Sequence, residues 1–167
     1  MPITKSTRNS EEQIFQIFIN CRKSLEENGI FQWTRHYPGK EHITMDIANG
    51  VLYQLEENNI LLGVICINSQ QELEYSTVNW FGETAKSLVV HRLAIDPQFQ
   101  NQGHAKTLMA FAEEMALDSG CTSIRLDAYN GNKKALRFYK QLGYYKRGQV
   151  FFPERELPFT CFERTLE

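Results

Sequence analysis

Residues 89–106 read VVHRLAIDPQFQNQGHAK, a stretch that predicts a buried strand leading through a turn into a helix. The first seven residues are apolar except for His91 and Arg92, as expected of a strand covered on both faces. Pro97 ends the strand because proline has no N–H to donate to a neighbouring strand. From residue 106 to residue 118 apolar side chains recur with the helical period, and Ser119-Gly120 supplies a stop.

Gly103 stands where this turn enters the helix. The start of a helix carries free backbone N–H groups at the positive end of its dipole, and glycine has no Cβ to keep an anion away. The turn is therefore suited to a phosphate group. The chain contains neither GxGxxG nor GxxxxGK followed by Ser or Thr, so the usual dinucleotide and nucleoside-triphosphate sites are not expected.

Two spaced motifs carry a resemblance to a known family. Residues 100–105, QNQGHA, match a pattern of Gln or Arg, two residues, Gly, one residue, then Gly or Ala. Residues 132–144, NKKALRFYKQLGY, match N-x-x-A-x-x-F-Y-x-x-x-G followed by Phe or Tyr, and a second expected strand at residues 122–129 lies between the motifs. In this order they resemble the GNAT superfamily of acyl-CoA-dependent N-acyltransferases. The resemblance covers essentially the whole chain.

The composition suits one globular domain covering residues 1–167. Hydrophobic residues make up 42% and charged residues 23% of the chain, ordinary values that exclude disorder as the main state. A net charge of -2 gives no electrostatic reason to expect binding to nucleic acid or to an anionic membrane. The four cysteines include no CxxC pair, and no N-terminal segment has the apolar core of a signal peptide. We therefore expect a cytoplasmic protein with reduced thiols.

Outside the motifs, the pattern of apolar residues predicts helices and hairpins. The expected elements are a helix ending at Asn28-Gly29, a short helix at 41–48, a hairpin of strands 51–55 and 60–67, and a closing hairpin of strands 145–152 and 159–166. Residues 68–87 fit neither period, and their structure is left open.

This order predicts the α/β class (α+β) with a mixed sheet, because only the middle of the chain has helical crossovers long enough to join parallel strands. The resemblance implies a GNAT-like fold. In that fold a mostly antiparallel sheet contains a central pair of splayed parallel strands, here residues 88–95 and 122–129, and carries flanking helices.

The resemblance also implies acetyl-CoA as the cosubstrate and no metal. The backbone of Leu93, Ala94 and Ile95 would meet the pantetheine arm in the gap between the splayed strands. The following loop and helix start would hold the pyrophosphate, through Gln100, Asn101, Gln102, Gly103, His104, Ala105 and Lys106. Asn132 is either the N-cap of the next helix or a cofactor contact, and it can be both.

Acyl transfer to an amine needs a proton donor for the departing thiolate and a base for the protonated amine. Tyr139 shares a helix face with Ala135 and Leu142, which directs its phenol toward the sheet. It occupies the position of the general-acid tyrosine in GNAT proteins, where it would also contact the cofactor. The alternative is a core aromatic whose hydroxyl bonds to a backbone group.

The sequence does not single out a base. His91, Glu83 and Asp127 are the candidates, and ordered water with backbone carbonyls could serve instead. Each candidate has a structural alternative: a hydrogen-bonded strand histidine, a solvated loop carboxylate, and an ion pair of Asp127 with Arg125 or Arg92.

The sequence thus predicts an N-acetyltransferase that transfers an acetyl group from acetyl-CoA to a primary amine by direct attack in a ternary complex. A non-catalytic acyl-CoA-binding or regulatory module of the same fold is the alternative, and a nucleotide-binding domain is a second one. The acceptor, a small-molecule or peptide amine, is unidentified. Trp33 and Tyr37 in residues 31–40 either contact it or pack their loop onto the core.

A homodimer is also expected, with no nucleic-acid and no membrane partner. Near the C-terminus the chain carries four phenylalanines, more aromatic surface than a two-stranded edge can easily cover: Phe151, Phe152, Phe159 and Phe162.

Overall fold

The computed structural model describes residues 2–167 of the chain. They form two compact units. The first contains the residues up to Ile67 together with Arg92–Phe111, and the second contains Asn68–His91 and Ala112–Glu167. The expectation of one domain over the whole chain stays a prediction.

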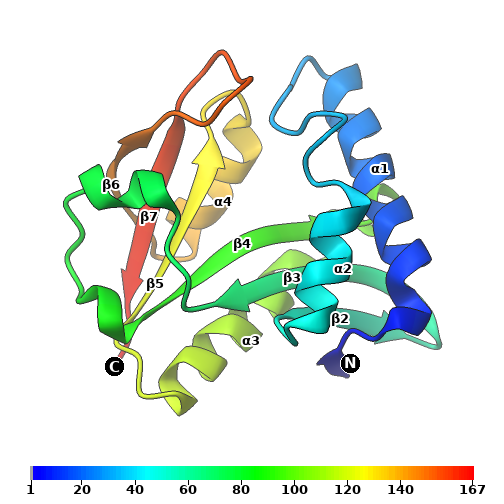
Figure 1. The fold of residues 1–167 in the computed structure, drawn as a ribbon, viewed down its shortest axis with the longest axis horizontal. Coiled ribbons are helices and arrows are strands. Elements are labelled where there is room, and N and C mark those ends of the chain that lie inside the picture. Colours follow the sequence, from blue (N-terminus) through cyan, green and yellow to red (C-terminus); the bar gives the residue numbers. More distant parts are fainter. Residues whose placement is uncertain (1) are drawn as a thin grey trace. The chain divides into compact units, whose positions relative to one another are not determined.

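The four helices are α1 (Glu11–Glu27), α2 (Lys40–Ala48), α3 (His104–Asp118) and α4 (Lys133–Gln141). The strands are β1 (Ile3–Lys5), β2 (Leu52–Glu57), β3 (Ile60–Asn68), β4 (Ser87–Ile95), β5 (Ser123–Tyr129), β6 (Tyr145–Val150) and β7 (Phe159–Thr165). In the first unit, α1 and α2 lie next to each other, in blue and cyan (Figure 1). These bounds confirm the expected helices and both hairpins.

The strands form one mixed sheet with the order β1-β2-β3-β4-β5-β7-β6. The pairs β1–β2, β2–β3, β5–β7 and β6–β7 are antiparallel. β4 and β5 pair in parallel, Ser87–Val89 against Ser123–Arg125. The predicted fold class is therefore confirmed, with the parallel pair on the strands expected. β1 was not foreseen, because three residues are too few to show a period.

The β2–β3 hairpin follows local chemistry. Its turn residues Asn58 and Asn59 have φ of 53° and 64°, a left-handed conformation that asparagine tolerates and that a two-residue hairpin requires. The pairing shifts register after Leu55, and a Cβ added to Gly63 would lie 2.6 Å from the Ala94 carbonyl oxygen. Gly63 therefore permits a close approach of the two backbones.

The C-terminal aromatics are divided between core and surface. Phe162 is fully buried and Phe159 is 8% exposed, whereas Phe151 is 67% exposed. The idea that all four rings form one surface is therefore wrong, since β7 pairs on both of its edges and its rings pack inside the second unit. The homodimer itself stays a prediction.

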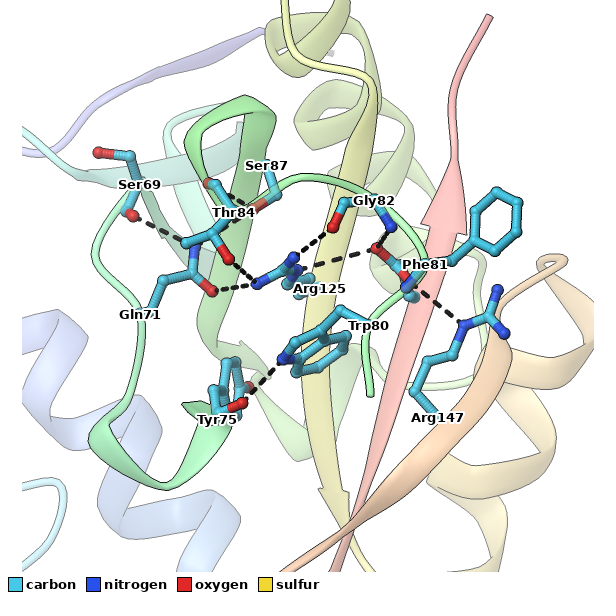
Figure 2. A network of polar contacts seen from close by, with 11 residues as sticks. Ser69, Gln71, Tyr75, Trp80, Phe81, Gly82, Thr84, Ser87, Arg125 and Arg147 are labelled. Atoms are coloured by element: carbon cyan, nitrogen blue, oxygen red, sulfur yellow. Dashed lines mark hydrogen bonds and ion pairs between the residues drawn. The ribbon is translucent and has the colours of Figure 1, made fainter. Parts of the chain in front are cut away.

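Residues 68–87, which the sequence left open, contain two short 3-10 helices, Leu73–Thr77 and Thr84–Lys86. Their order comes from tertiary contacts with Arg125 of β5, shown in Figure 2. The Arg125 guanidinium donates to Gly82 O at 2.7 Å and to Gln71 Oε1 at 3.0 Å, and it lies 4.5 Å from the centre of the Trp80 ring. The charged side chain of Arg125 thus orders a segment whose sequence shows neither a helical nor a strand period.

Glu163 of β7 completes this network. Its carboxylate accepts the N–H groups of Phe81 and Gly82 at 2.7 and 2.9 Å, and it forms ion pairs with Arg125 and Arg147. Arg125 and Glu163 are each 1% exposed. A buried charge is tolerated only when it is paired and hydrogen-bonded. The two charges pair with each other and both residues form hydrogen bonds, although Arg125 Nε is buried without a hydrogen-bond partner within residues 2–167.

Replacing Arg125 by Met should therefore lower the free energy of unfolding by about 3–5 kcal/mol, because Glu163 loses its buried partner and the 68–87 segment its anchor. The control is Arg147→Met, which removes the other partner of Glu163 from a position that is 27% exposed. It should cost only about 0–1 kcal/mol. Chemical denaturation of both variants measures the difference, and equal losses would contradict the anchoring role of Arg125.

Candidate active site

The predicted site residues fall into the two units, and each group is described within its own unit. Leu93 to Lys106 belong to the first unit, and Asn132 and Tyr139 belong to the second.

The start of α3 has the backbone of an anion cradle. Gly103 has φ of +87°, and Asn101, two residues earlier, has φ of +63°. The first helical hydrogen bond runs from Thr107 N–H to Gly103 O at 3.1 Å, so the N–H groups of the first turn have no acceptor within the helix. A Cβ on Gly103 would meet no atom within 4 Å, which means that the space beside this turn is open. The backbone geometry therefore suits a phosphate.

The side chain of Gln100 forms a hydrogen bond within this loop. Gln100 Nε2 donates to Ile95 O at 2.9 Å, and Cys21 Sγ donates to the same oxygen at 3.1 Å. Gln100 thus closes the turn. The Ile95 carbonyl has both lone pairs occupied, so Ile95 could meet a ligand only through other atoms.

His104 points inward, with 6% exposure and a buried Nδ1 that has no hydrogen-bond partner. Of the remaining loop residues, Asn101, Gln102 and Lys106 are exposed and Ala105 is half-buried. Lys106 is therefore the side chain that can add positive charge at the surface of the turn. On β4, Leu93 is half-buried and Ala94 is buried.

Asn132 caps α4 in the second unit. Its side-chain oxygen accepts the N–H of Ala135 at 3.1 Å, the bond expected of an N-cap residue. The capping role is confirmed, and a role in cofactor binding stays a prediction.

Tyr139 lies on α4 among aromatic rings. Its ring centre is 5.9 Å from that of Phe162 and 6.0 Å from that of Tyr144, and the residue is 8% exposed. Within residues 2–167 its hydroxyl has no hydrogen-bond partner. The hydroxyl oxygen is not among the fully buried polar atoms that lack a partner, so it stays accessible. The alternative of a hydroxyl bonded to the backbone is thus absent from this structure.

Burial raises the pKa of the Tyr139 phenol above its ordinary value, and the nearby charge of Asp127 raises it further. The hydroxyl therefore keeps its proton through the neutral range and can act as a donor.

Asp127 of β5 is held by Tyr75, whose hydroxyl donates to Asp127 Oδ2 at 2.5 Å. Desolvation raises the pKa of Asp127 to about 6, although the Tyr75 hydrogen bond lowers it. The proposed ion pairs of Asp127 are wrong: Arg125 pairs with Glu163, and Arg92 pairs with Asp46 at 2.5 Å. Such a carboxylate is mostly ionised at neutral pH yet titrates close to it, as a general base should.

The two other candidate bases differ from Asp127. The His91 side chain is 7% exposed, with Nδ1 2.8 Å from Glu72 Oε1 and Nε2 2.6 Å from Asn68 Oδ1. His91 is thus a hydrogen-bonded strand histidine, the alternative named from the sequence. Glu83 is exposed in its loop. Tyr75 and Glu72 were missed by sequence reasoning, since their segment carried no period to place them.

Trp33 and Tyr37 pack onto the first unit. The Trp33 ring is edge-on to Phe18 with centres 5.4 Å apart, and the Tyr37 hydroxyl accepts from Arg92 Nη1 at 2.7 Å. The packing alternative therefore describes both residues in this structure.

A family model described as "Acetyltransferase (GNAT) family" matches residues 12–144. The chain belongs to the GNAT family. An uncharacterised N-acetyltransferase of Bacillus subtilis is 25% identical over 136 residues, covering 80% of this chain and 75% of the relative. A thialysine N-ε-acetyltransferase of Sus scrofa is 33% identical over 60 residues, 36% of this chain and 35% of that protein. The chain therefore spans only about a third of the length of this mammalian relative.

Solved acetyltransferase structures share the fold. An acetyltransferase of Streptococcus agalactiae has a TM-score of 0.83 at 24% identity, covering 99% of this chain and 95% of that one. A second, from Salmonella typhimurium and solved with acetyl-CoA, has a TM-score of 0.74 at 15% identity, covering 100% and 94%. Within the described part of this GNAT protein, no helix is long and apolar enough to cross a membrane. Residues 2–167 also contain no cluster of three metal-ligating side chains.

The pKa of Asp127 predicts a pH-dependent stability. The folded state holds this proton up to about pH 6, whereas an unfolded aspartate loses it near 3.8, so the carboxyl weakens the fold as pH rises between these values. The full effect amounts to roughly 3 kcal/mol above pH 6. Asp127→Asn keeps an acceptor for Tyr75 and should remove this decline. Unfolding free energies of both proteins from pH 4 to 7 provide the test, and parallel curves would contradict the raised pKa.

Proposed function

We propose that this protein is an N-acetyltransferase that transfers an acetyl group from acetyl-CoA to a primary amine by direct attack in a ternary complex. The observation that carries the proposal is the open, left-handed turn at Gly103, which begins α3 inside a family motif. Acetyl-CoA is the choice of cosubstrate because the family is an acetyltransferase family and a structural relative was solved with it.

The chain's own residues would divide the work of binding. The N–H groups of the first turn of α3 would hold the pyrophosphate, with Lys106 adding charge. The backbone of Leu93, Ala94 and Ile95 and the capping residue Asn132 would contact the rest of the cosubstrate, as the family resemblance implies. Acetyl-CoA, when bound, supplies the activated thioester.

In the reaction, the amine nitrogen forms a bond to the acetyl carbon as the carbon–sulfur bond breaks. Tyr139 would donate its phenolic proton to the departing sulfur, since its hydroxyl has no competing partner in the protein. The amine must lose a proton to Asp127 or to water. Asp127 is the best of the three candidate bases, because His91 is engaged at both ring nitrogens and Glu83 lies in solvent.

A cytoplasmic location and an amine acceptor belong to the same proposal. The free state of Cys21, Cys66, Cys121 and Cys161 supports a reducing compartment. A homodimer without nucleic-acid or membrane partners completes it. The alternative, a non-catalytic acyl-CoA-binding module, would bind acetyl-CoA without turning it over in a broad panel of amines.

The phosphate cradle is tested by Gly103→Glu, which places a side chain and a negative charge beside the free N–H groups. Affinity for CoA should fall below detection by calorimetry while circular dichroism shows a folded protein. Gly120→Glu is the matched control, because Gly120 also has a positive φ of +77° and open space, at the opposite end of α3. Unchanged CoA binding by the Gly103 variant would exclude the cradle.

The proton donor is tested by Tyr139→Phe, which keeps the ring and removes the hydroxyl. We expect kcat to fall by about 10²–10⁴-fold with little change in acetyl-CoA affinity. Tyr144→Phe is the control, because its hydroxyl is buried without a partner and cannot reach a substrate. If the Tyr139 variant has the wild-type kcat under conditions where chemistry limits turnover, Tyr139 is not the proton donor and has a structural role only.

A further inference from the structure

A cavity of about 190 Å³ lies in the first unit, between α1 and the loop that leads to α2. Phe15, Phe18, Ile19 and Arg22 line one side, and Thr34, Arg35 and Pro38 line the other. The α1 residues follow the spacing i, i+3, i+4, i+7, which places them on one helix face. The cavity thus has an apolar wall that ends in a guanidinium group.

The cavity has two cations and no acid among its lining residues. Within residues 2–167, Arg35 has neither a hydrogen bond nor an ion pair. Arg22 Nη1 donates to Thr34 O at 3.4 Å, and its Nε forms a long ion pair of 4.0 Å with Glu26 Oε2 but has no hydrogen-bond partner. Two guanidinium groups beside one small cavity repel each other, and a bound anion would offset that repulsion.

The third polar group of the cavity can only donate. Thr34 Oγ1 accepts the N–H groups of His36 and Tyr37 at 3.1 and 3.0 Å, which uses both lone pairs and leaves its own proton. The Thr34 carbonyl is also engaged, by Arg22 and by Tyr37 N–H at 3.3 Å. The free hydrogen-bonding groups on the side chains of this site are therefore all donors, which matches a ligand group that only accepts.

The rim of the cavity is held in place by contacts within the protein. Tyr37 is fixed by Arg92, whose other nitrogens donate to Asp46, and Trp33 packs against Phe18. The loop is therefore positioned before any ligand arrives, and the ordering cost of binding is reduced.

We propose that this cavity binds the carboxylate of a small acid whose apolar part lies against Phe15, Phe18 and Ile19. A planar guanidinium group can donate two parallel hydrogen bonds to the two oxygens of a carboxylate. With two arginines, each guanidinium can bind one carboxylate oxygen, or both can bind the same carboxylate. Resting on the proposed function, the natural ligand is the acceptor itself, an amino acid or peptide that carries an apolar group and a carboxylate besides its amine.

The binding test needs no catalysis. Calorimetry with 3-phenylpropionate should detect binding, whereas the uncharged 3-phenylpropionamide and inorganic phosphate should bind at least about tenfold more weakly. Arg35→Gln and Arg22→Gln should each weaken 3-phenylpropionate binding by about tenfold or more. Lys23→Gln removes the same charge from an exposed position on α1 and should leave binding unchanged.

Equal binding of the acid and the amide, no binding of the acid, or an equal loss in the Lys23 variant would overturn the carboxylate site. Stronger binding of phosphate would overturn the carboxylate as its ligand. The acceptor role is tested by comparing kcat/KM for phenylalanine and phenylalaninamide with acetyl-CoA, where the acid should be preferred through KM and the preference lost in Arg35→Gln. Binding of 3-phenylpropionate without turnover of any amine would leave the site standing and reject the acetyltransferase.

Discussion

The pairing of Arg125 with Glu163 is the interaction on which the second unit depends. Both side chains are almost fully buried, so each charge must find its partner inside the protein. Arg125 on β5 and Glu163 on β7 stand opposite each other in the antiparallel register, and both form further hydrogen bonds to residues of the 68–87 segment. The sheet thereby fixes a segment that has little regular structure.

That segment in turn shapes the chemistry of the second unit. Trp80 lies against Arg125 and donates its Nε1–H to the Tyr75 backbone oxygen at 3.0 Å, and Tyr75 donates its hydroxyl to Asp127. Asp127 then acts on the pKa of the Tyr139 phenol. The structural ion pair and the two groups proposed for proton transfer therefore belong to one connected network, in which the protonation of Asp127 depends on how well the 68–87 segment is held.

In the first unit, contacts of Arg92 position one wall of the proposed binding cavity. Arg92, in the part of β4 that belongs to this unit, fixes Asp46 of α2 and Tyr37 of the preceding loop, and this loop forms one wall of the cavity. Arg92 is matched by Asp46, whereas Arg35 has no acceptor within residues 2–167. Arg22 has only the Thr34 carbonyl and a 4.0 Å ion pair with Glu26, so both arginines keep donors for the proposed ligand.

The sequence by itself determined the elements and the features that depend on near neighbours in the chain. The helical period of residues 106–118, the hairpin of residues 51–67, the cap at Asn132 and the glycine at the start of α3 are local consequences of side-chain and backbone chemistry, and the structure has them as expected. The two motifs indicated the GNAT family for the same reason, since each is a short continuous segment: one at the β4–α3 connection and the other along α4 and the turn after it.

Only the tertiary structure decided which charges meet. Asp127 could have paired with Arg125 or Arg92, yet Glu163 and Asp46, 38 and 46 positions away from those arginines, took them instead. The burial of the C-terminal phenylalanines was likewise decided by the position of β7 between β5 and β6. Phe159 and Phe162 are buried there, and Phe151 is exposed. Such partners are selected by burial, which penalises any unpaired charge or exposed ring, and burial is a property of the folded chain that no local pattern records.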